Sequence, residues 1–75
     1  MRSSSILRGL GEEVRARRTQ KNLTQEALAH LAGLHMNVVG RLERGKYNPT
    51  VLTLSYIALK LNTSLEDLFA GAAKR

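Results

Sequence analysis

The side chains best suited to chemistry gather on one predicted helix, which runs from about His35 to Arg44. Its exposed side would carry Met36, Asn37, Gly40, Arg41 and Arg44, next to a basic loop. Asparagine can form two hydrogen bonds to adenine, and arginine can do the same to O6 and N7 of guanine. Met36 has no such donors and would contact a thymine methyl or simply pack. Because a purely structural helix would more often mix acidic and basic residues here, the pattern favours contact with DNA.

Catalysis and metal binding find no support in the rest of the sequence. There is no serine–histidine–acid arrangement and no glycine-rich phosphate cradle, and helix capping accounts for Glu66 and Asp67. Cysteine is absent, which excludes disulfides and thiolate metal sites. His30 and His35 are five residues apart, whereas ligands on one helical face fall three or four apart. We therefore predict no enzyme, no metal, no cofactor and no small-molecule substrate, and we interpret His30 as an exposed helix residue.

Size and charge predict a small domain with a polyanionic partner. The 75 residues allow one domain, and no apolar run approaches the roughly 20 residues that span a bilayer. With no signal-peptide core either, we expect a cytoplasmic, nucleoid-associated protein. Twelve basic and six acidic residues give a net charge of +6, and nine of the basic residues but only four of the acidic ones precede Tyr47. This positive field is expected where the first two-thirds of a chain face nucleic acid, although a solvated basic surface would explain it equally well.

Apolar spacing predicts an all-α fold, a compact five-helix bundle. One helix would span about Leu7 to Lys21 and stop at Asn22, and a second, capped by Thr24, would begin at Gln25 and end at Gly33. The third, from His35 to Arg44, would turn Val38, Val39 and Leu42 inward and end at Gly45. A fourth would cover Leu52 to Leu61, and a short fifth would run from Leu65 to about Phe69. Residues 1–5 are predicted as a flexible tail, 6–70 as the DNA-binding domain and 71–75 as a second tail.

A helix-turn-helix pattern occupies the 20 residues that start at Gln25. The fourth, eighth, tenth, fifteenth and eighteenth places are all apolar, and they are Leu28, Ala32, Leu34, Val39 and Leu42. The fifth place, Ala29, must be small because the third helix crosses it, and Gly33 would supply the positive φ of the turn. Two short helices around a glycine also occur in bundles that bind no DNA. The exposed basic face of the third helix favours the DNA-binding interpretation.

This pattern resembles the helix-turn-helix of the Cro/CI, or XRE, family of phage repressors, whose fold is lambda-repressor-like. Four further segments match the sequence pattern of the family, and they are Leu23–Gln25, Leu42–Gly45, Asn48–Thr50 and Leu65–Phe69. Within the family the sequence most resembles small regulators such as restriction-modification controller proteins, through Ala32–His35 and Glu43–Gly45. Met36–Val38 departs from the arginine, threonine and aromatic residue often found in that subgroup, so the resemblance fixes neither the subgroup nor the operator sequence.

The resemblance implies roles for individual residues. The third helix would enter the major groove with Met36, Asn37 and Arg41 against base edges. Phosphate contacts would come from the start of the second helix, from the start and end of the third and from the loop after it, and the residues are Gln25, His35, Arg44, Lys46 and Asn48. Arg18 and Glu43 would form a partly buried ion pair between the first and third helices. Gly40 would permit close approach to DNA, or it would reflect drift at an exposed site.

Members of such a family usually bind as two-fold dimers, so the resemblance also implies a homodimer on a palindromic operator in double-stranded DNA. The dimer surface would lie in the C-terminal part, around Tyr56, Leu65 and Phe69. Such a protein would regulate transcription as a repressor or an activator. The alternative from another functional class is a protein-interaction module, such as an antitoxin-like partner protein.

Overall fold

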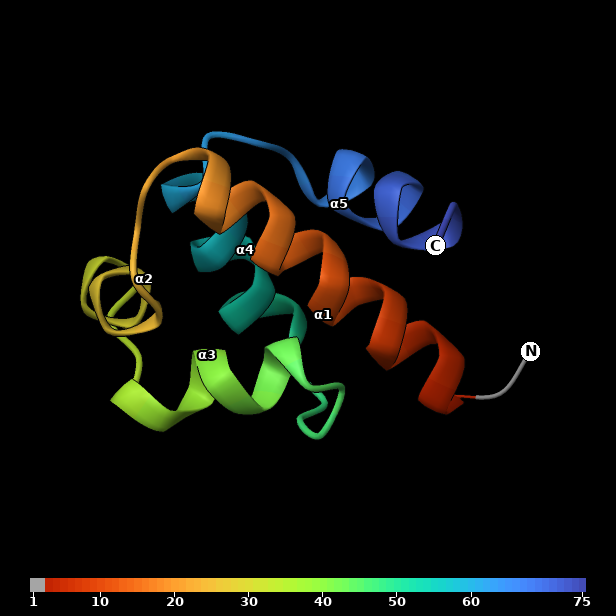
Figure 1. Ribbon diagram of the computed structural model, residues 1–75, viewed down its shortest axis with the longest axis horizontal. Helices are drawn as coiled ribbons and strands as arrows, with labels where there is room; N and C mark the ends of the chain where they lie inside the picture. Colours follow the sequence, from red (N-terminus) through yellow and green to blue (C-terminus); the bar gives the residue numbers. More distant parts are fainter. Residues whose placement is uncertain (1–2) are drawn as a thin grey trace.

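The structure, a computed structural model, describes residues 3–75, which form five helices and no strand (Figure 1). In chain order they are α1 Ser3–Gln20, α2 Gln25–Leu31, α3 Met36–Glu43, α4 Val51–Lys60 and α5 Leu65–Ala73. The predicted all-α, five-helix architecture is confirmed. Within this range no helix combines the length and the apolar character that a membrane span requires.

Polar side chains and left-handed residues set the helix ends. Thr24, Thr50 and Ser64 cap α2, α4 and α5, and each side-chain oxygen accepts a hydrogen bond of 3.0 Å from the backbone N–H three residues later. Caps of this kind stabilise a helix by about 0.5–2 kcal/mol. Asn22 and Asn62 follow α1 and α4 with φ of 58° and 60°, a conformation that asparagine tolerates better than most residues. The breaks between helices therefore arise from short-range chemistry.

The first and last helices are longer than the sequence predicted. Helix α1 begins at Ser3 rather than near Leu7, and α5 continues to Ala73 rather than ending near Phe69. Much of each predicted tail is thus helical, while Met1 and Arg2 lie outside the described residues. The cause is packing of the two helices side by side (Figure 1), so close that a Cβ on Gly9 would lie 2.6 Å from the Ala72 carbonyl oxygen. Neighbouring helices supply this stabilisation, and local spacing does not reveal it.

One apolar core joins all five helices. Its fully buried large side chains come from every helix and are Leu10, Val14, Leu28, Val39, Leu42, Ile57 and Leu68. Burial of each such side chain contributes about 1.5–3 kcal/mol. Helix α1 lies between α5 and α3, so it links the C-terminal helix to the helix that the sequence assigned to DNA (Figure 1).

A second glycine sets the distance between α1 and α3. A Cβ on Gly11 would overlap the backbone carbonyl oxygen of Leu42 and lie 2.8 Å from that of Glu43. Backbone atoms cannot move aside as a flexible side chain can, so α1 approaches the last turn of α3 this closely only because residue 11 has no side chain. Gly11 therefore helps to hold α3 against the bundle.

Candidate nucleic-acid interface

Helices α2 and α3 form a compact unit around a tight turn. Gly33 adopts φ of 70°, and Leu34 N donates a 2.8 Å hydrogen bond to the carbonyl oxygen of Ala29. Ala29 itself is buried where the helices meet, as its small size predicted. Only residues 32–35 separate the two helices. The turn thus fixes α3 relative to α2, as a helix-turn-helix requires.

The outer face of α3 brings together the residues that could read DNA. Met36, Asn37, Arg41 and Arg44 are all exposed, whereas Val39 and Leu42 on the opposite face are buried. Val38, expected to face inward, is only half-buried. A shallow polar hollow of about 310 Å³ is lined by Gln25, Met36, Asn37, Gly40, Arg41 and Arg44. Hydrogen-bond donors from α2 and α3 therefore converge on one surface.

Gly40 was predicted to lie on the exposed side of the helix, and this prediction is wrong. The residue is buried, because the side chains of Gln25 and Arg44 cover it. A Cβ at this position would lie 3.1 Å from Gln25 Oε1 and 3.4 Å from Arg44 Nη1. Sequence drift at an exposed position therefore does not explain the glycine in this helix. Glycine here lets two polar side chains lie flat against α3.

A network of side-chain hydrogen bonds connects this surface to the core. Arg18 donates from Nε to Glu43 Oε2 at 2.6 Å and from Nη2 to Oε1 at 3.0 Å, while its Nη1 donates to the carbonyl oxygen of Leu23 at 2.7 Å. Gln25 Nε2 donates to the same Glu43 Oε1 at 2.9 Å. The hydrogen bonds to Glu43 raise the pKa of Arg18 above its ordinary value, although burial opposes them. Glu43 thus holds α1, the start of α2 and the end of α3 in one arrangement.

His35 caps the helix that it was predicted to begin. It is the N-cap of α3, and its Nδ1 accepts a 3.3 Å hydrogen bond from Asn37 N. Because Nδ1 accepts, the proton of the neutral ring must lie on Nε2. The exposed side chain therefore keeps one N–H donor at the beginning of α3. The sequence suggested a phosphate contact here but did not reveal the cap.

The loop after α3 is attached firmly to that helix. Gly45 has φ of 71°, Gly45 N donates to the Leu42 carbonyl oxygen at 3.0 Å, and Lys46 N donates to that of Arg41 at 2.9 Å. Lys46 and Asn48 are exposed on this loop, as phosphate contacts would need to be. Between them Tyr47 is half-buried, and its ring lies 5.6 Å from Arg41 Cζ. Tyr47 was not predicted as a functional residue, although the sequence carries a signal for it, an aromatic residue beside a lysine at the end of a basic helix.

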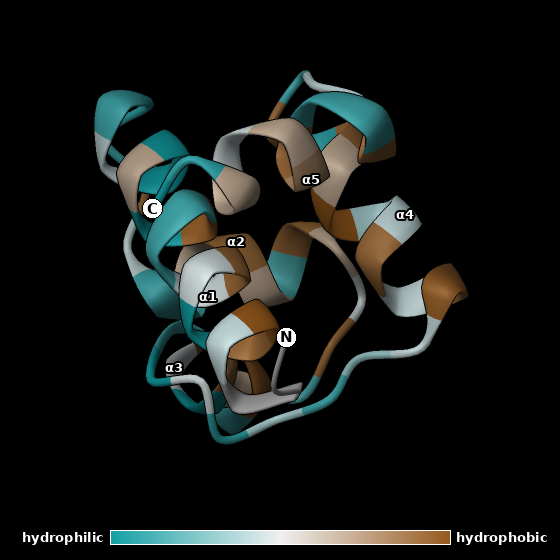
Figure 2. Ribbon diagram, turned by 90° about the vertical axis from the view of Figure 1, so that its right-hand side faces the viewer, coloured by the Kyte–Doolittle hydropathy of each residue, from teal (hydrophilic) through white to brown (hydrophobic). Residues whose placement is uncertain are grey.

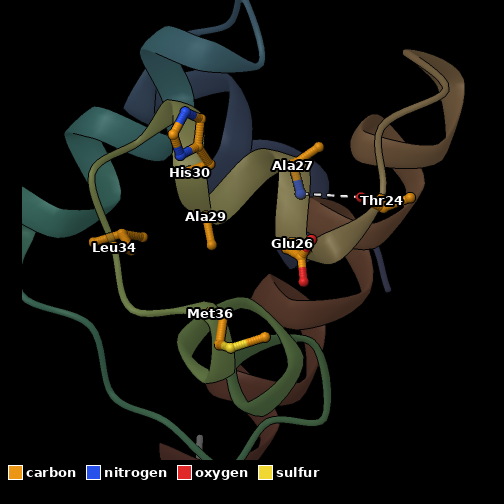
Figure 3. A pocket seen from close by; sticks show the side chains of 7 residues that line it. All are labelled: Thr24, Glu26, Ala27, Ala29, His30, Leu34 and Met36. Atoms are coloured by element: carbon orange, nitrogen blue, oxygen red, sulfur yellow. Dashed lines mark hydrogen bonds between the residues drawn. The ribbon is translucent and has the colours of Figure 1, made fainter.

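A second hollow lies between α2 and the start of α3. About 490 Å³ in volume, it is lined by Thr24, Glu26, Ala27, Ala29, His30, Leu34 and Met36 (Figure 3). Figure 3 shows Met36 on α3 facing the α2 side chains across this space. His30 is exposed. No cluster of three or more histidine or acidic side chains that could hold a metal occurs among residues 3–75.

A separate apolar surface lies on α4 and α5. Figure 2 shows the α4 ribbon with several hydrophobic residues, and Val51, Leu52, Tyr56 and Leu59 are 46–73% exposed. Phe69 of α5 is 46% exposed, whereas Leu65 is half-buried against the core. The expected dimer residues thus lie on neighbouring helices, and Val51, Leu52 and Leu59 extend this α4–α5 surface.

Comparisons with known proteins agree with this geometry. A family model described as Helix-turn-helix, HTH_3, matches residues 14–68. The chain is 46% identical over 59 residues to the control protein C.SmaI of Serratia marcescens, and the match covers 79% of this chain and 70% of that protein. The matched family segment runs from α1 into α5 and contains all of α2, the turn and α3.

Solved structures show the same fold. The restriction-modification controller protein C.AhdI of Aeromonas hydrophila superposes with a TM-score of 0.80 at 37% identity, over 83% of this chain and 94% of that one. The clp gene regulator ClgR of Corynebacterium glutamicum gives a TM-score of 0.88 at 26% identity, over 92% of this chain and 73% of that one. The five helices and their order therefore recur in other regulators.

Proposed function

This chain belongs to the helix-turn-helix family HTH_3, of the XRE type, and from that membership we propose that it binds a palindromic operator as a homodimer. The family consists of DNA-binding transcription regulators and not of enzymes, so double-stranded DNA is the partner of this domain. Similarity to C.SmaI and C.AhdI supports a regulatory role of the controller type.

One observation carries the proposal of sequence-specific binding, namely the shared polar surface of α2 and α3. Asn37 and Arg41 are exposed on α3, and their side chains suit adenine and guanine edges in the major groove. Met36, 57% exposed, adds an apolar contact for a thymine methyl. These three residues would read bases, and the exposed ends of the same unit would bind phosphates.

The phosphate contacts we propose are Gln25, His35, Arg44, Lys46 and Asn48. All five are exposed, and they lie at the start of α2, at the cap of α3 and in the loop that follows it. Gln25 uses one amide hydrogen for Glu43 and has a second one free for an anion. Such contacts set the position of the protein on the duplex but carry no sequence information.

A homodimer is supported by the α4–α5 surface and by the limited reach of one helix. A single recognition helix reads too few base pairs for useful selectivity, whereas two helices about 34 Å apart read successive major grooves. The exposed apolar side chains of α4, which include Tyr56, form with Phe69 of α5 a surface that a second copy would cover. We propose that Tyr56, Leu65 and Phe69 lie in this interface.

Selection of bound sequences from a random duplex pool, at near-physiological salt, tests the proposal. A consensus of two inverted half-sites is expected, and sedimentation of the bound complex should give two protein chains per duplex. A single, non-repeated half-site would contradict the dimer, and enrichment of no sequence would contradict specific binding and favour the antitoxin-like interaction module. A variant with both Asn37→Ala and Arg41→Ala should lose the consensus while still folding, because both residues are exposed.

A further inference from the structure

We propose that Tyr47 determines sequence specificity, because its ring holds the guanidinium of Arg41 where that group can read a guanine. The inference rests on the proposed function, in which Arg41 contacts a base. Arg41 Cζ lies 5.6 Å from the centroid of the Tyr47 ring, within the range of a cation–π contact. Tyr47 is thus a positioning residue that acts through Arg41.

The ring can position another group because it is itself fixed. Tyr47 packs against the apolar core and is only half-buried, so one part of the ring is held while another is open. The backbone before it is tied to α3, since Lys46 N donates to the Arg41 carbonyl oxygen at 2.9 Å and Gly45 N donates to that of Leu42 at 3.0 Å. The two residues whose side chains meet are therefore joined by a short, hydrogen-bonded segment.

The Arg41 side chain needs such support if it is to hold one conformation. It is exposed, and within residues 3–75 it forms no ion pair, so without the ring its long side chain would sample many rotamers. A guanidinium that lies over an aromatic face keeps its in-plane N–H groups free, and these are the donors that bind guanine O6 and N7. Ordering Arg41 before DNA arrives lowers the entropic cost of binding the correct base.

A different role for Tyr47 would depend on another part of the side chain. Its hydroxyl could donate to a phosphate, which would strengthen binding to every sequence alike. The ring and the hydroxyl are separable, because Tyr47→Phe keeps the face over Arg41 and removes only the hydroxyl. Tyr47→Leu removes the face, and Tyr47→Met replaces it with a flexible chain that still fills space against the core.

The experiment measures affinity for the selected operator and for the same duplex with the base pair read by Arg41 replaced. Tyr47→Leu should lower the discrimination between these duplexes about two- to five-fold, the usual value of an exposed cation–π contact. Tyr47→Phe should retain it. In an Arg41→Ala background, Tyr47→Leu should change discrimination at this position no further. In the free protein, ring currents should shift the Arg41 side-chain protons upfield relative to those of the exposed Arg15.

Several results would overturn the proposal. They are equal losses on both duplexes in Tyr47→Leu, a loss in Tyr47→Phe as large as that in Tyr47→Leu, and an effect that persists without Arg41. Unshifted Arg41 protons would overturn it too. If Tyr47→Leu fails to fold, Tyr47→Met takes its place. The chemical shifts of the Arg41 protons in the unaltered protein test the ring contact without any substitution. Failure of the proposed function is distinct, because the unaltered protein would then discriminate at no base pair.

Discussion

The guanidinium of Arg18 and the carboxylate of Glu43 form two hydrogen bonds, of 2.6 and 3.0 Å, that join α1 to the last residue of α3. The Glu43 side chain is only 2% exposed, so water cannot replace a lost partner. Because Gln25 also donates to Glu43, the same carboxylate links the core to the surface we assign to DNA. Rigidity of the recognition helix thus depends on a charge pair inside the bundle.

Removal of one partner of this pair should destabilise the fold. Arg18→Met strands the buried Glu43 carboxylate, and we expect the free energy of unfolding to fall by about 3–5 kcal/mol. Urea unfolding followed by circular dichroism measures it. The double variant Arg18→Met, Glu43→Leu leaves no charge behind and should recover much of the loss. A double variant as unstable as Arg18→Met would show that packing, and not the stranded charge, causes the effect.

Arg41→Ala should weaken binding to the operator by about 1–3 kcal/mol and relax the preference at one base pair. The substitution removes the guanidinium N–H groups that would donate two hydrogen bonds to O6 and N7 of guanine. Titration of the selected operator and of its single-base variants provides the measurement. Arg41→Lys is the matched control, because it keeps the charge but not the planar fork, and it should also relax the preference. Equal losses on specific and random duplexes would remove Arg41 from the base readers.

Lys46→Ala should weaken binding to all sequences alike. Loss of one phosphate contact releases one counterion fewer, so the slope of log affinity against log salt should decrease by about one. Lys74→Ala is the control for charge alone, since Lys74 follows α5 on the other side of α1 from α3 (Figure 1). A slope that changes equally in both variants would mean that Lys46 acts only through net charge.

Gly40→Ala should separate stability from DNA binding. Alanine is favoured over glycine within a helix by about 1 kcal/mol, so the free energy of unfolding should rise or stay level. The new Cβ would lie 3.1 Å from Gln25 Oε1, so that side chain must shift by a few tenths of an ångström, and we expect the shift to weaken its hydrogen bond with Glu43. We expect affinity to fall by roughly 0.5–1.5 kcal/mol, the net value of one hydrogen bond. In a Gln25→Ala background the same substitution should cost no affinity, and a full cost there would refute the mechanism.

Gly40 also shows where sequence-based prediction stops. Caps such as Thr24 and turns such as Gly33 were predictable because their cause lies within a few residues. The burial of Gly40 depends on Gln25, fifteen positions earlier in the sequence, and on where the turn places α2. The pairing of Arg41 with Tyr47 likewise follows from the conformation of the loop. The side chains of the proposed DNA surface were identifiable from their types, and the family resemblance indicated the Arg18–Glu43 pair, but the contacts made by Gly40 and Tyr47 were not predictable.

The surroundings of Glu13 were only partly predictable, because Arg17 lies one helical turn later whereas Arg75 and Gly71 come from the far end of the chain. Its carboxylate lies 2.7 Å from Arg17 Nε and 3.1 Å from Arg75 Nε. A Cβ on Gly71 would overlap this carboxylate, so a larger residue there would force the Glu13 side chain to move. Arg17 in turn donates to Thr63 Oγ1 at 2.9 Å. The network fastens both ends of α5 to α1 and should make stability depend on pH.

The direction of that dependence follows from the pKa of Glu13. Burial alone would raise this pKa, but the hydrogen bonds from Arg17 and Arg75 outweigh burial and hold it below the ordinary 4.5. A carboxyl whose pKa is lower in the folded state stabilises the fold at pH values above its unfolded pKa. That contribution is complete well above pH 4.5 and is lost as the pH falls below 4.5 through the folded pKa. Urea unfolding between pH 7 and pH 3, at constant protein concentration, should show this loss.

Glu13→Gln should remove this part of the pH dependence. At pH 7 it should lower the free energy of unfolding by about 1.5–3 kcal/mol, the value of hydrogen bonds to a charged group. The difference between variant and unaltered protein should then shrink as the pH falls, because protonation of Glu13 has the same effect as the substitution. Glu12→Gln is the control, since Glu12 is exposed and forms no ion pair within residues 3–75. Parallel pH profiles for Glu13→Gln and the unaltered protein would show that the network does not couple stability to pH.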